Sequence, residues 1–188
     1  MSATMAMVSA WAGPDLDAWV PRPGVRTRRC RTIACPPERL WAIARSLRLR
    51  DTRTLGRLVA WRIPDTPLSL TFDALFRAYP FVVLDQGERH VVAGLCGRIW
   101  TLARDYPRLA GPEDFAAWRE PDTVRVAFAH WVAARSDGGA DLCTEARVEA
   151  TDRAAALRLK ALWAVVGRFE PLVASEPLSL AARRAAAR

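Results

Sequence analysis

The hydrophobic pattern changes its period at Asp152, and this change constrains the fold more than any other feature of the chain. Before it, residues 124–134 and 141–150 alternate apolar with polar side chains, which predicts two half-buried strands. The Ser-Asp-Gly-Gly sequence at 136–139 predicts a tight hairpin turn between them. After it, Asp152 can cap a helix whose apolar side chains recur at spacings of three and four: Ala155, Leu159, Leu162, Trp163, Val166 and Phe169. Such a helix must bury its apolar face against the sheet, so the chain is predicted to be α+β.

The rest of the chain supplies further strands for such a sheet. We predict a strand at 26–34, a helix from Pro36 and Pro37 to residue 47, a short helix at 55–61, strands at 81–85 and 89–100 around a turn at Gln86–Gly87, and a short strand at 115–118. The stretch 68–80 fits a strand, a helix or both in turn. The expected architecture is a curved antiparallel sheet of about six or seven strands wrapped around a long C-terminal helix, with two short helices after the first strand.

The two ends of the chain carry breaks in regular structure. Residues 1–24 are rich in proline and glycine, so we expect an arm, pinned by Trp11 and Trp19, ahead of a single domain at 25–188. In the final helix, Pro171 and Pro177 are expected to interrupt the hydrogen bonding, with Ser175 capping the last piece.

Composition excludes several classes of protein. Hydrophobic residues make up 51% of the chain, which is too many for a disordered protein. No apolar run approaches the roughly 18 residues of a membrane helix, and the N-terminus lacks the pattern of a secretion signal. We therefore expect no membrane span and a cytoplasmic location. The net charge of +8 comes from arginine, since Lys160 is the only lysine, and the arginines are scattered. We therefore expect no nucleic-acid partner.

The cysteines and motifs point to neither a metal nor a cofactor. None of the four cysteines stands in a C-x-x-C pair, and Cys30 and Cys35 point to opposite faces of a predicted strand. We expect no zinc site, no disulfide framework, and small buried thiols in a reducing compartment. The chain has no P-loop, no dinucleotide-binding glycine motif, no serine-hydrolase elbow and no zinc-protease motif.

The last hairpin and helix carry a family resemblance. The stretch VRVAFAHWVAARSDGGADLCTEARVEATDRAAALRLKALW, at 124–163, resembles the START-like superfamily, also called SRPBCC, and its polyketide cyclase-like bacterial members. The matching pieces are Thr144–Val148, Thr151–Asp152 and Leu162–Trp163. The CPPERLWAIA stretch at 35–44 is similar to the superfamily's first strand-to-helix junction, and Gly94, Arg98 and Trp100 are similar to its middle strand. The resemblance spans residues 26–170 and implies a helix-grip fold. It is weak for activity, because the superfamily includes binding proteins, transporters and several enzyme types.

Strand alternation assigns side chains to the two faces of the sheet. In 124–134, the larger apolar set is placed inward, under the helix: Val124, Val126, Phe128, His130 and Val132. The matching inner set of the next strand is Leu142, Thr144, Ala146 and Val148. The opposite face carries Glu145, Arg147 and Glu149, which we expect to be wet and joined by weak ion pairs. In 89–100, apolarity places Val91, Ala93 and Leu95 inward, whereas the resemblance implies that Arg98 and Trp100 reach the pocket mouth. A bulge at Gly94 or Gly97 would reconcile the two.

His130 is the sharpest candidate for a functional side chain. On an apolar inward face it can orient a ligand, act as a general base with Tyr79 or Asp73, or be a satisfied core histidine. His90 is expected to be solvated. Arg98 and Arg77 can meet a ligand carboxylate or be ordinary surface arginines. The full predicted pocket lining is Trp61, Phe72, Phe76, Tyr79, Arg98, Trp100, Phe128, His130, Thr144, Leu159 and Trp163.

Three functions remain open at this stage. The first is binding of a small hydrophobic molecule (a lipid, polyketide or aromatic metabolite) between the sheet and the final helix. The second is a cyclase or dehydratase with His130 as general base, so whether the protein is an enzyme stays undecided. The third is a partner-binding module with a filled core, which an exposed patch of Trp131, Trp118 or Trp11 would favour. We expect a monomer or a homodimer.

Overall fold

A computed structural model describes residues 13–63, 65–103, 106–168 and 170–187, with the backbone alone described at 170–173. Trp11 and Phe169 lie outside the described residues. In chain order the elements are β1 (Val25–Ile33), α1 (Pro37–Ser46), a 3-10 turn η1 (Leu49–Asp51), α2 (Leu55–Arg62), α3 (Phe72–Leu75), β2 (Val82–Gly87), β3 (His90–Gly97), α4 (Pro112–Ala117), β4 (Val124–Ala134), β5 (Ala140–Ala150), α5 (Arg153–Val166) and α6 (Glu170–Ala186). The fold is α+β, as predicted, and no described helix is long and apolar enough to cross a membrane.

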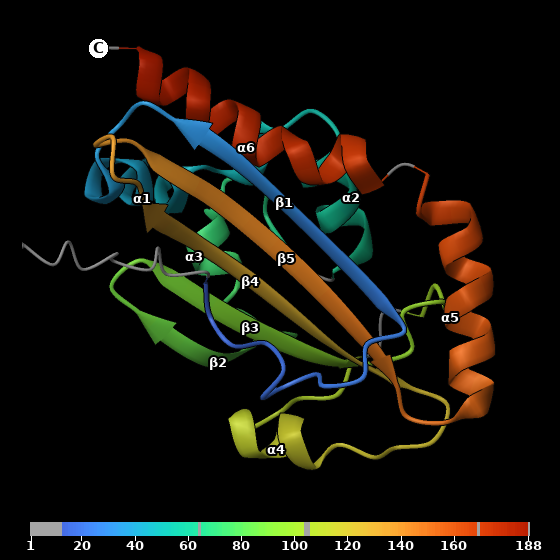
Figure 1. Cartoon of the computed structure of the whole chain (residues 1–188). Coiled ribbons are helices and arrows are strands. Elements are labelled where there is room, and N and C mark those ends of the chain that lie inside the picture. The colour runs from blue at the N-terminus through green and yellow to red at the C-terminus, as the bar shows by residue number, and fades with distance from the viewer. Residues whose placement is uncertain (1–12, 64, 104–105, 169, 188) are drawn as a thin grey trace, which may run out of the picture.

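The sheet is antiparallel, with the strand order β1-β5-β4-β3-β2 (Figure 1). The described residues form five strands, so the expected count of six or seven is wrong. Two stretches for which a strand was predicted or left open, 115–118 and 68–80, contain helical residues instead. In α3, the Thr71 hydroxyl accepts a hydrogen bond from Ala74 N at 3.2 Å and caps the helix. In α4, Pro112 occupies the first turn, where a proline costs no internal hydrogen bond.

The β2–β3 hairpin also differs from the prediction. Its turn lies at 88–89, after Gln86 and Gly87 rather than at them. The irregularity lies in β2, where the register shifts between Val83 and Asp85, and not at a glycine of β3. Glycine at 94 has a different role, because a Cβ there would lie 2.6 Å from the ring of Phe115. This small residue therefore allows α4 to pack closely on the sheet.

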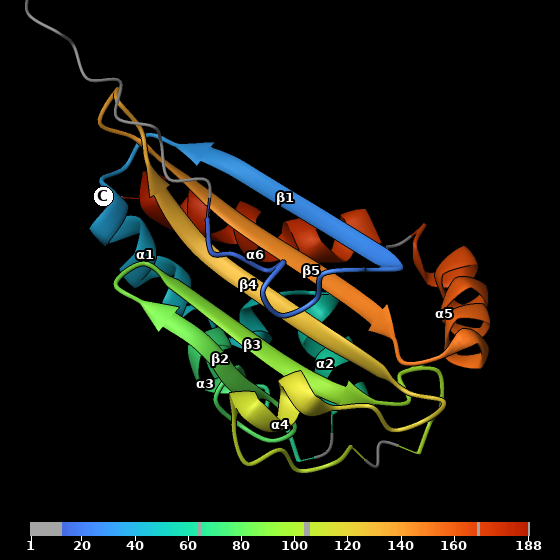
Figure 2. The same cartoon turned by 60° about the horizontal axis from the view of Figure 1, so that its bottom comes forward.

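The C-terminal helix is two helices rather than one. Asp152 caps α5 as predicted, since its Oδ1 accepts a hydrogen bond from Ala155 N at 2.8 Å. The helix ends at Val166, ahead of Pro171, which falls in the first turn of α6 and needs no internal donor there. Pro177 lies inside α6 without ending it, and Ser175 is an interior residue of α6 rather than a cap. Figure 2 shows α6 running along β1 and β5, with α5 beyond one end of the sheet.

The two faces of the sheet are covered by different parts of the chain. One face, here called the helix face, carries α1, α3 and α6 at one end and packs against Leu159 of α5 at the other. The opposite face, here called the arm face, is covered by residues 13–24 and α4, where Leu16, Val20 and Phe115 are at most 1% exposed. The arm therefore belongs to the packed body of the domain.

Ionic side chains on the arm face are buried, contrary to the expectation that they would be wet. Glu145, Arg147 and Glu149 are between 2 and 7% exposed because the arm covers them. Arg147 Nε donates to Glu145 at 2.7 Å, and its Nη1 pairs with Asp17 of the arm. Arg125 pairs with Glu149 at 3.2 Å. Sequence alternation placed these residues on the correct face but could not show what covers that face.

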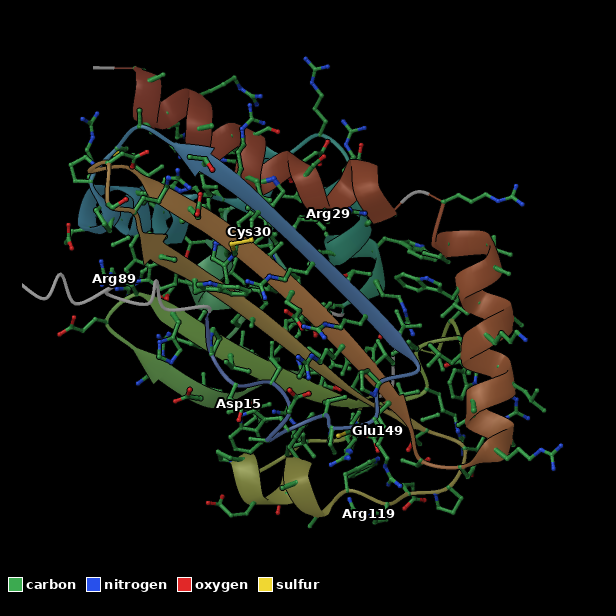
Figure 3. All side chains as sticks on the ribbon, viewed as in Figure 1. Asp15, Arg29, Cys30, Arg89, Arg119 and Glu149 are labelled. Atoms are coloured by element: carbon green, nitrogen blue, oxygen red, sulfur yellow. A yellow bond between two sulfur atoms is a disulfide. The ribbon has the colours of Figure 1, made fainter. Side chains whose placement is uncertain are left out.

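The cysteines give a second correction. Cys30 of β1 and Cys143 of β5 are directly paired in register and form a disulfide, which is visible in Figure 3. Cys35 and Cys96 are free and buried, as expected for small core residues. The prediction compared Cys30 with Cys35 within one strand and missed the pairing of the first strand with the last. The expectation that all four cysteines are small buried thiols is therefore wrong for Cys30 and Cys143.

Candidate functional site

Six side chains at the centre of the helix face remain partly exposed. We call them the central window: Thr27, Arg29, Phe128, His130, Thr144 and Ala146. They form two rows across β1, β5 and β4. In one row Ala146 pairs with Thr27 on one side and Phe128 on the other, and in the next row Thr144 pairs with Arg29 and His130. Central strands of a packed sheet normally bury such positions completely. The helices therefore cover this face incompletely at its middle.

Two separate apolar clusters flank the central window. At one end Ile33, Val132 and Leu142 pack under α1 and α6. At the other end Val25, Val126 and Val148 pack with Leu159 of α5. Along β4, the interval from Val126 to Val132 is six residues, or on the order of 20 Å. The helix face therefore has two buried clusters, linked by Phe81, with partly exposed side chains between them.

His130 supplies a neutral polar group inside this interval. Its ring lies 5.9 Å from the ring of Trp41, and within the described part of the chain no group hydrogen-bonds to it. Burial lowers the pKa of His130 to about 4, so the ring is neutral at pH 7. A neutral imidazole offers one hydrogen-bond donor and one acceptor.

Three phenylalanines form an aromatic wall beside His130. Phe128 lies 6.3 Å from Phe76 and 5.8 Å from Phe81, measured between ring centroids. Phe76 and Phe81 meet edge to face at 5.7 Å. Phe81 contacts both flanking clusters, so this wall bridges them. Stacked and edge-on rings of this kind give an apolar surface with fixed geometry.

The opposite side of the central window is more polar. Thr144 donates its hydroxyl to Ala129 O at 3.2 Å and keeps acceptor capacity. Arg29 on β1, labelled in Figure 3, adds a guanidinium in the same row. The sequence prediction missed Thr27 and Arg29 as site residues, although alternation within 25–33 places them on one face. The missing information was that β1 pairs with β5.

Among the predicted lining residues, the structure brings Phe76, Phe128, His130 and Thr144 together at the central window. Phe72 is buried in the cluster under α1. Three others belong to the cluster beside α5: Leu159, Trp163 and Tyr79. The Tyr79 hydroxyl donates to Tyr106 O at 2.8 Å and is occupied there.

Three predicted lining residues are placed elsewhere. The Trp61 side chain, on α2, is 59% exposed. Arg98 and Trp100 lie beyond β3, which ends at Gly97. Arg98 hydrogen-bonds to Asp122 O at 3.3 Å. Trp100 packs partly buried against the cluster beside α5, with Arg158 Cζ 6.0 Å from its ring centroid. The strand was predicted to continue to residue 100, and its earlier end accounts for the difference.

The proton-transfer partners proposed for His130 are also engaged elsewhere. Asp73 is bound by Arg45 at 3.1 Å and by Arg77 at 3.3 Å. Burial opposes the charged form, but these two hydrogen-bonded arginines lower the pKa of Asp73. Arg77 is thus paired internally rather than poised for a ligand. His90 lies on the arm face, away from the central window, and its Nε2 is 3.0 Å from Asp85 Oδ2. Its side chain is 18% exposed, so it is less solvated than expected.

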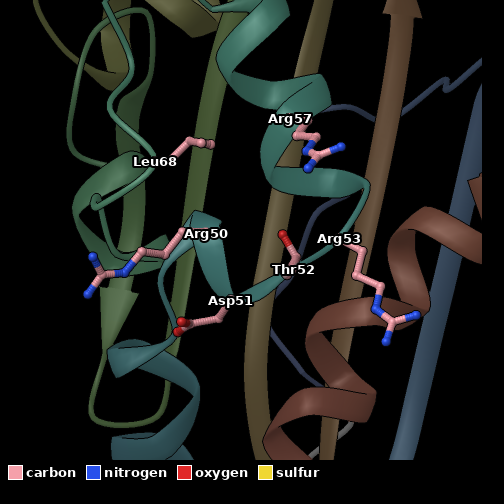
Figure 4. A pocket seen from close by; sticks show the side chains of 6 residues that line it. All are labelled: Arg50, Asp51, Thr52, Arg53, Arg57 and Leu68. Carbon is pink, nitrogen blue, oxygen red and sulfur yellow. The ribbon is translucent and has the colours of Figure 1, made fainter.

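Two surface hollows lie outside the central window. One, of about 410 Å³, is lined by Arg50, Asp51, Thr52, Arg53, Arg57 and Leu68 (Figure 4). The other, of about 460 Å³, shares three of these residues and adds part of α6: Ser175, Glu176, Ser179, Leu180 and Arg183. Neither hollow is lined by a predicted pocket residue. Among the described residues, no group of histidine, cysteine or carboxylate side chains can hold a metal ion.

Comparison with known proteins adds little. No family model and no curated protein matches the chain. Among solved structures, the chain is similar to the crystal structure of TTHA0849 from Thermus thermophilus, at 12% sequence identity. The match covers 87% of this chain and 98% of that one, with a TM-score of 0.35. This similarity is too low to support an argument about function.

Proposed function

We propose that the protein binds a small, largely apolar molecule at the central window. The observation that carries the proposal is the division of the helix face into two buried clusters with a partly exposed interval between them. A protein that needs only stability would fill this interval with side chains. The START-like superfamily that the sequence resembles includes binding proteins, alongside transporters and enzymes.

The side chains around the interval define the kind of ligand. Phe76, Phe81 and Phe128 offer aromatic surface, while His130 and Thr144 offer hydrogen-bonding groups at its edge. Burying roughly 200 Å² of apolar ligand surface contributes about 5 kcal/mol before the entropic cost of binding. The ligand class is therefore an apolar or aromatic body with at least one hydrogen-bonding group.

An enzymatic role of the cyclase or dehydratase kind has less support. A general base works best when its pKa lies near the working pH, and the pKa of His130 is about 4. A second proton-transfer group is also needed, and Tyr79 and Asp73 are hydrogen-bonded elsewhere. An exposed patch of Trp131, Trp118 or Trp11 would favour the partner-binding alternative. Trp131 is 1% exposed, Trp118 packs partly buried on the arm face, and Trp11 lies outside the described residues. We therefore propose that His130 orients the ligand.

Native mass spectrometry of the purified protein tests this proposal. We expect the protein to carry a bound molecule or to take one up from a panel of lipids and aromatic metabolites in a thermal-shift screen. Phe128→Ala removes part of the aromatic wall, and the exposed α5 residue Val165, changed to Ala, is the matched control. A wild-type protein that neither carries nor is stabilised by any apolar compound contradicts the proposal.

A further inference from the structure

Three exposed apolar side chains gather around η1 and α2. Leu58 and Trp61 of α2 are 43% and 59% exposed, and Leu68 of the following loop is 40% exposed. The loop is held against η1, because Arg50 N donates to Leu68 O at 2.8 Å. Leu58 and Trp61 are three positions apart and share one side of the helix. A group of large apolar side chains in water marks a surface that contacts another phase or molecule.

Arginines surround these apolar side chains. Arg50, Arg53 and Arg57 line the same hollow as Leu68, and Figure 4 shows them projecting from η1, α2 and the link between them. Asp51 is the one acid in this lining, and its carboxylate already accepts a hydrogen bond from Arg184 at 2.7 Å. Within the described ranges, none of the three arginines forms an ion pair. The surface is therefore positive as well as apolar.

We propose that this surface, which we call the α2 surface (Arg50, Arg53, Arg57, Leu58, Trp61 and Leu68), rests on an anionic lipid membrane. Arginines pair with lipid phosphates, while tryptophan and leucine enter the boundary between headgroups and acyl chains. A free phosphate would use the arginines but leave the apolar side chains in water. Tryptophan and arginine also occur at protein interfaces, so an acidic protein partner is the alternative that the experiment separates from the membrane. The α2 surface shares no residue with the central window, and this proposal does not rest on the window's function.

Vesicle sedimentation tests the proposal on the full chain. The vesicles contain either phosphatidylcholine alone or phosphatidylcholine with about 30% phosphatidylglycerol, in about 0.1 M salt, where charge screening is moderate. The test variant is Arg57→Glu with Trp61→Ser. The matched control is Arg153→Glu with Leu157→Ser on α5, where the same spacing joins an exposed arginine to a leucine that is 63% exposed. Melting temperatures of both variants establish that they are folded.

We expect wild type to sediment with the anionic vesicles and much less with phosphatidylcholine. One surface arginine changes membrane affinity about fivefold, so the α2 variant should lose at least tenfold, while the α5 variant stays within about twofold of wild type. Equal losses in both variants would place the effect in net charge and overturn the proposal. Equal binding to the two vesicles, or no binding to either, overturns it as well. Tight binding to polyglutamate without vesicle binding would overturn it in favour of an acidic protein partner.

Discussion

The half-open character of the central window can be tested by enlarging one side chain. Ala146 lies in the window between Thr27 and Phe128, whereas Ala129 lies on the arm face of β4 and is 1% exposed. Leucine adds three carbon atoms at either site. At a packed position such an addition costs about 1–3 kcal/mol, because neighbours must shift. At an open position the cost is within about 0.5 kcal/mol.

Thermal and urea denaturation of Ala146→Leu and Ala129→Leu measure this difference. In a domain of this size, 1 kcal/mol corresponds to roughly 2–4 °C in melting temperature. We therefore expect Ala129→Leu to melt roughly 3–9 °C below wild type and Ala146→Leu to melt within about 2 °C of it. Because the new side chain occupies the ligand's place, Ala146→Leu should also bind any stabilising compound at least tenfold more weakly, which is about 1.4 kcal/mol.

The opposite pattern would refute the reasoning. If Ala146→Leu loses as much stability as Ala129→Leu, side chains already fill the middle of the helix face. The two clusters would then be one continuous core, and the binding proposal would lose its basis.

Three further predictions concern titration, buried charge and cysteine pairing. Burial lowers the pKa of His130 from 6.5 to about 4, so the unfolded chain binds more protons than the folded chain between these pH values. As the pH falls through this interval, the unfolding free energy of wild type should drop by up to about 3 kcal/mol relative to that of His130→Leu. Urea midpoints that change in parallel for the two proteins would contradict this. Glu145→Gln leaves the buried Arg147 without its carboxylate partner and should lower the free energy of unfolding by about 3–5 kcal/mol. The control Glu38→Gln, in an exposed ion pair, should lower it by less than about 1 kcal/mol. Similar losses for the two variants in urea titrations would show that the network is not buried. Thiol titration of the denatured, unreduced protein should find two thiols, those of Cys35 and Cys96. The double variant Cys30→Ser with Cys143→Ser should lose about 2–4 kcal/mol of unfolding free energy. Four titratable thiols would exclude the disulfide.

Local patterns predicted the last hairpin and the start of α5 because their signals are complete within a short stretch. Asp152 needs only the following turn to act as a cap, and the Ser-Asp-Gly-Gly turn needs only its two strands. The strand count failed where a capping residue changed the outcome, as at Thr71, or where a proline opened a helix, as at Pro112. Those stretches are apolar enough for either structure, so periodicity alone did not decide between them.

The site could be predicted only in part, because its completion depends on strand order. Phe128, His130 and Thr144 were found from alternation in two neighbouring strands. Arg29 and the disulfide partner of Cys143 come from β1, whose place beside β5 requires a contact between residues more than 100 positions apart. The burial of Glu145 likewise depends on where the arm lies, and an arm without a regular pattern gives no signal of its position.

An NMR titration of the isotope-labelled protein with the neutral probe N-phenyl-1-naphthylamine tests the central claim most directly. The account predicts saturable shifts that are largest for amides near Phe128, His130 and Ala146, at the middle of β4 and β5. The same shifts should be absent in Ala146→Leu. Shifts that are unsaturable, or that are confined to the exposed side chains of α2 and α5, would contradict a binding site between the two clusters.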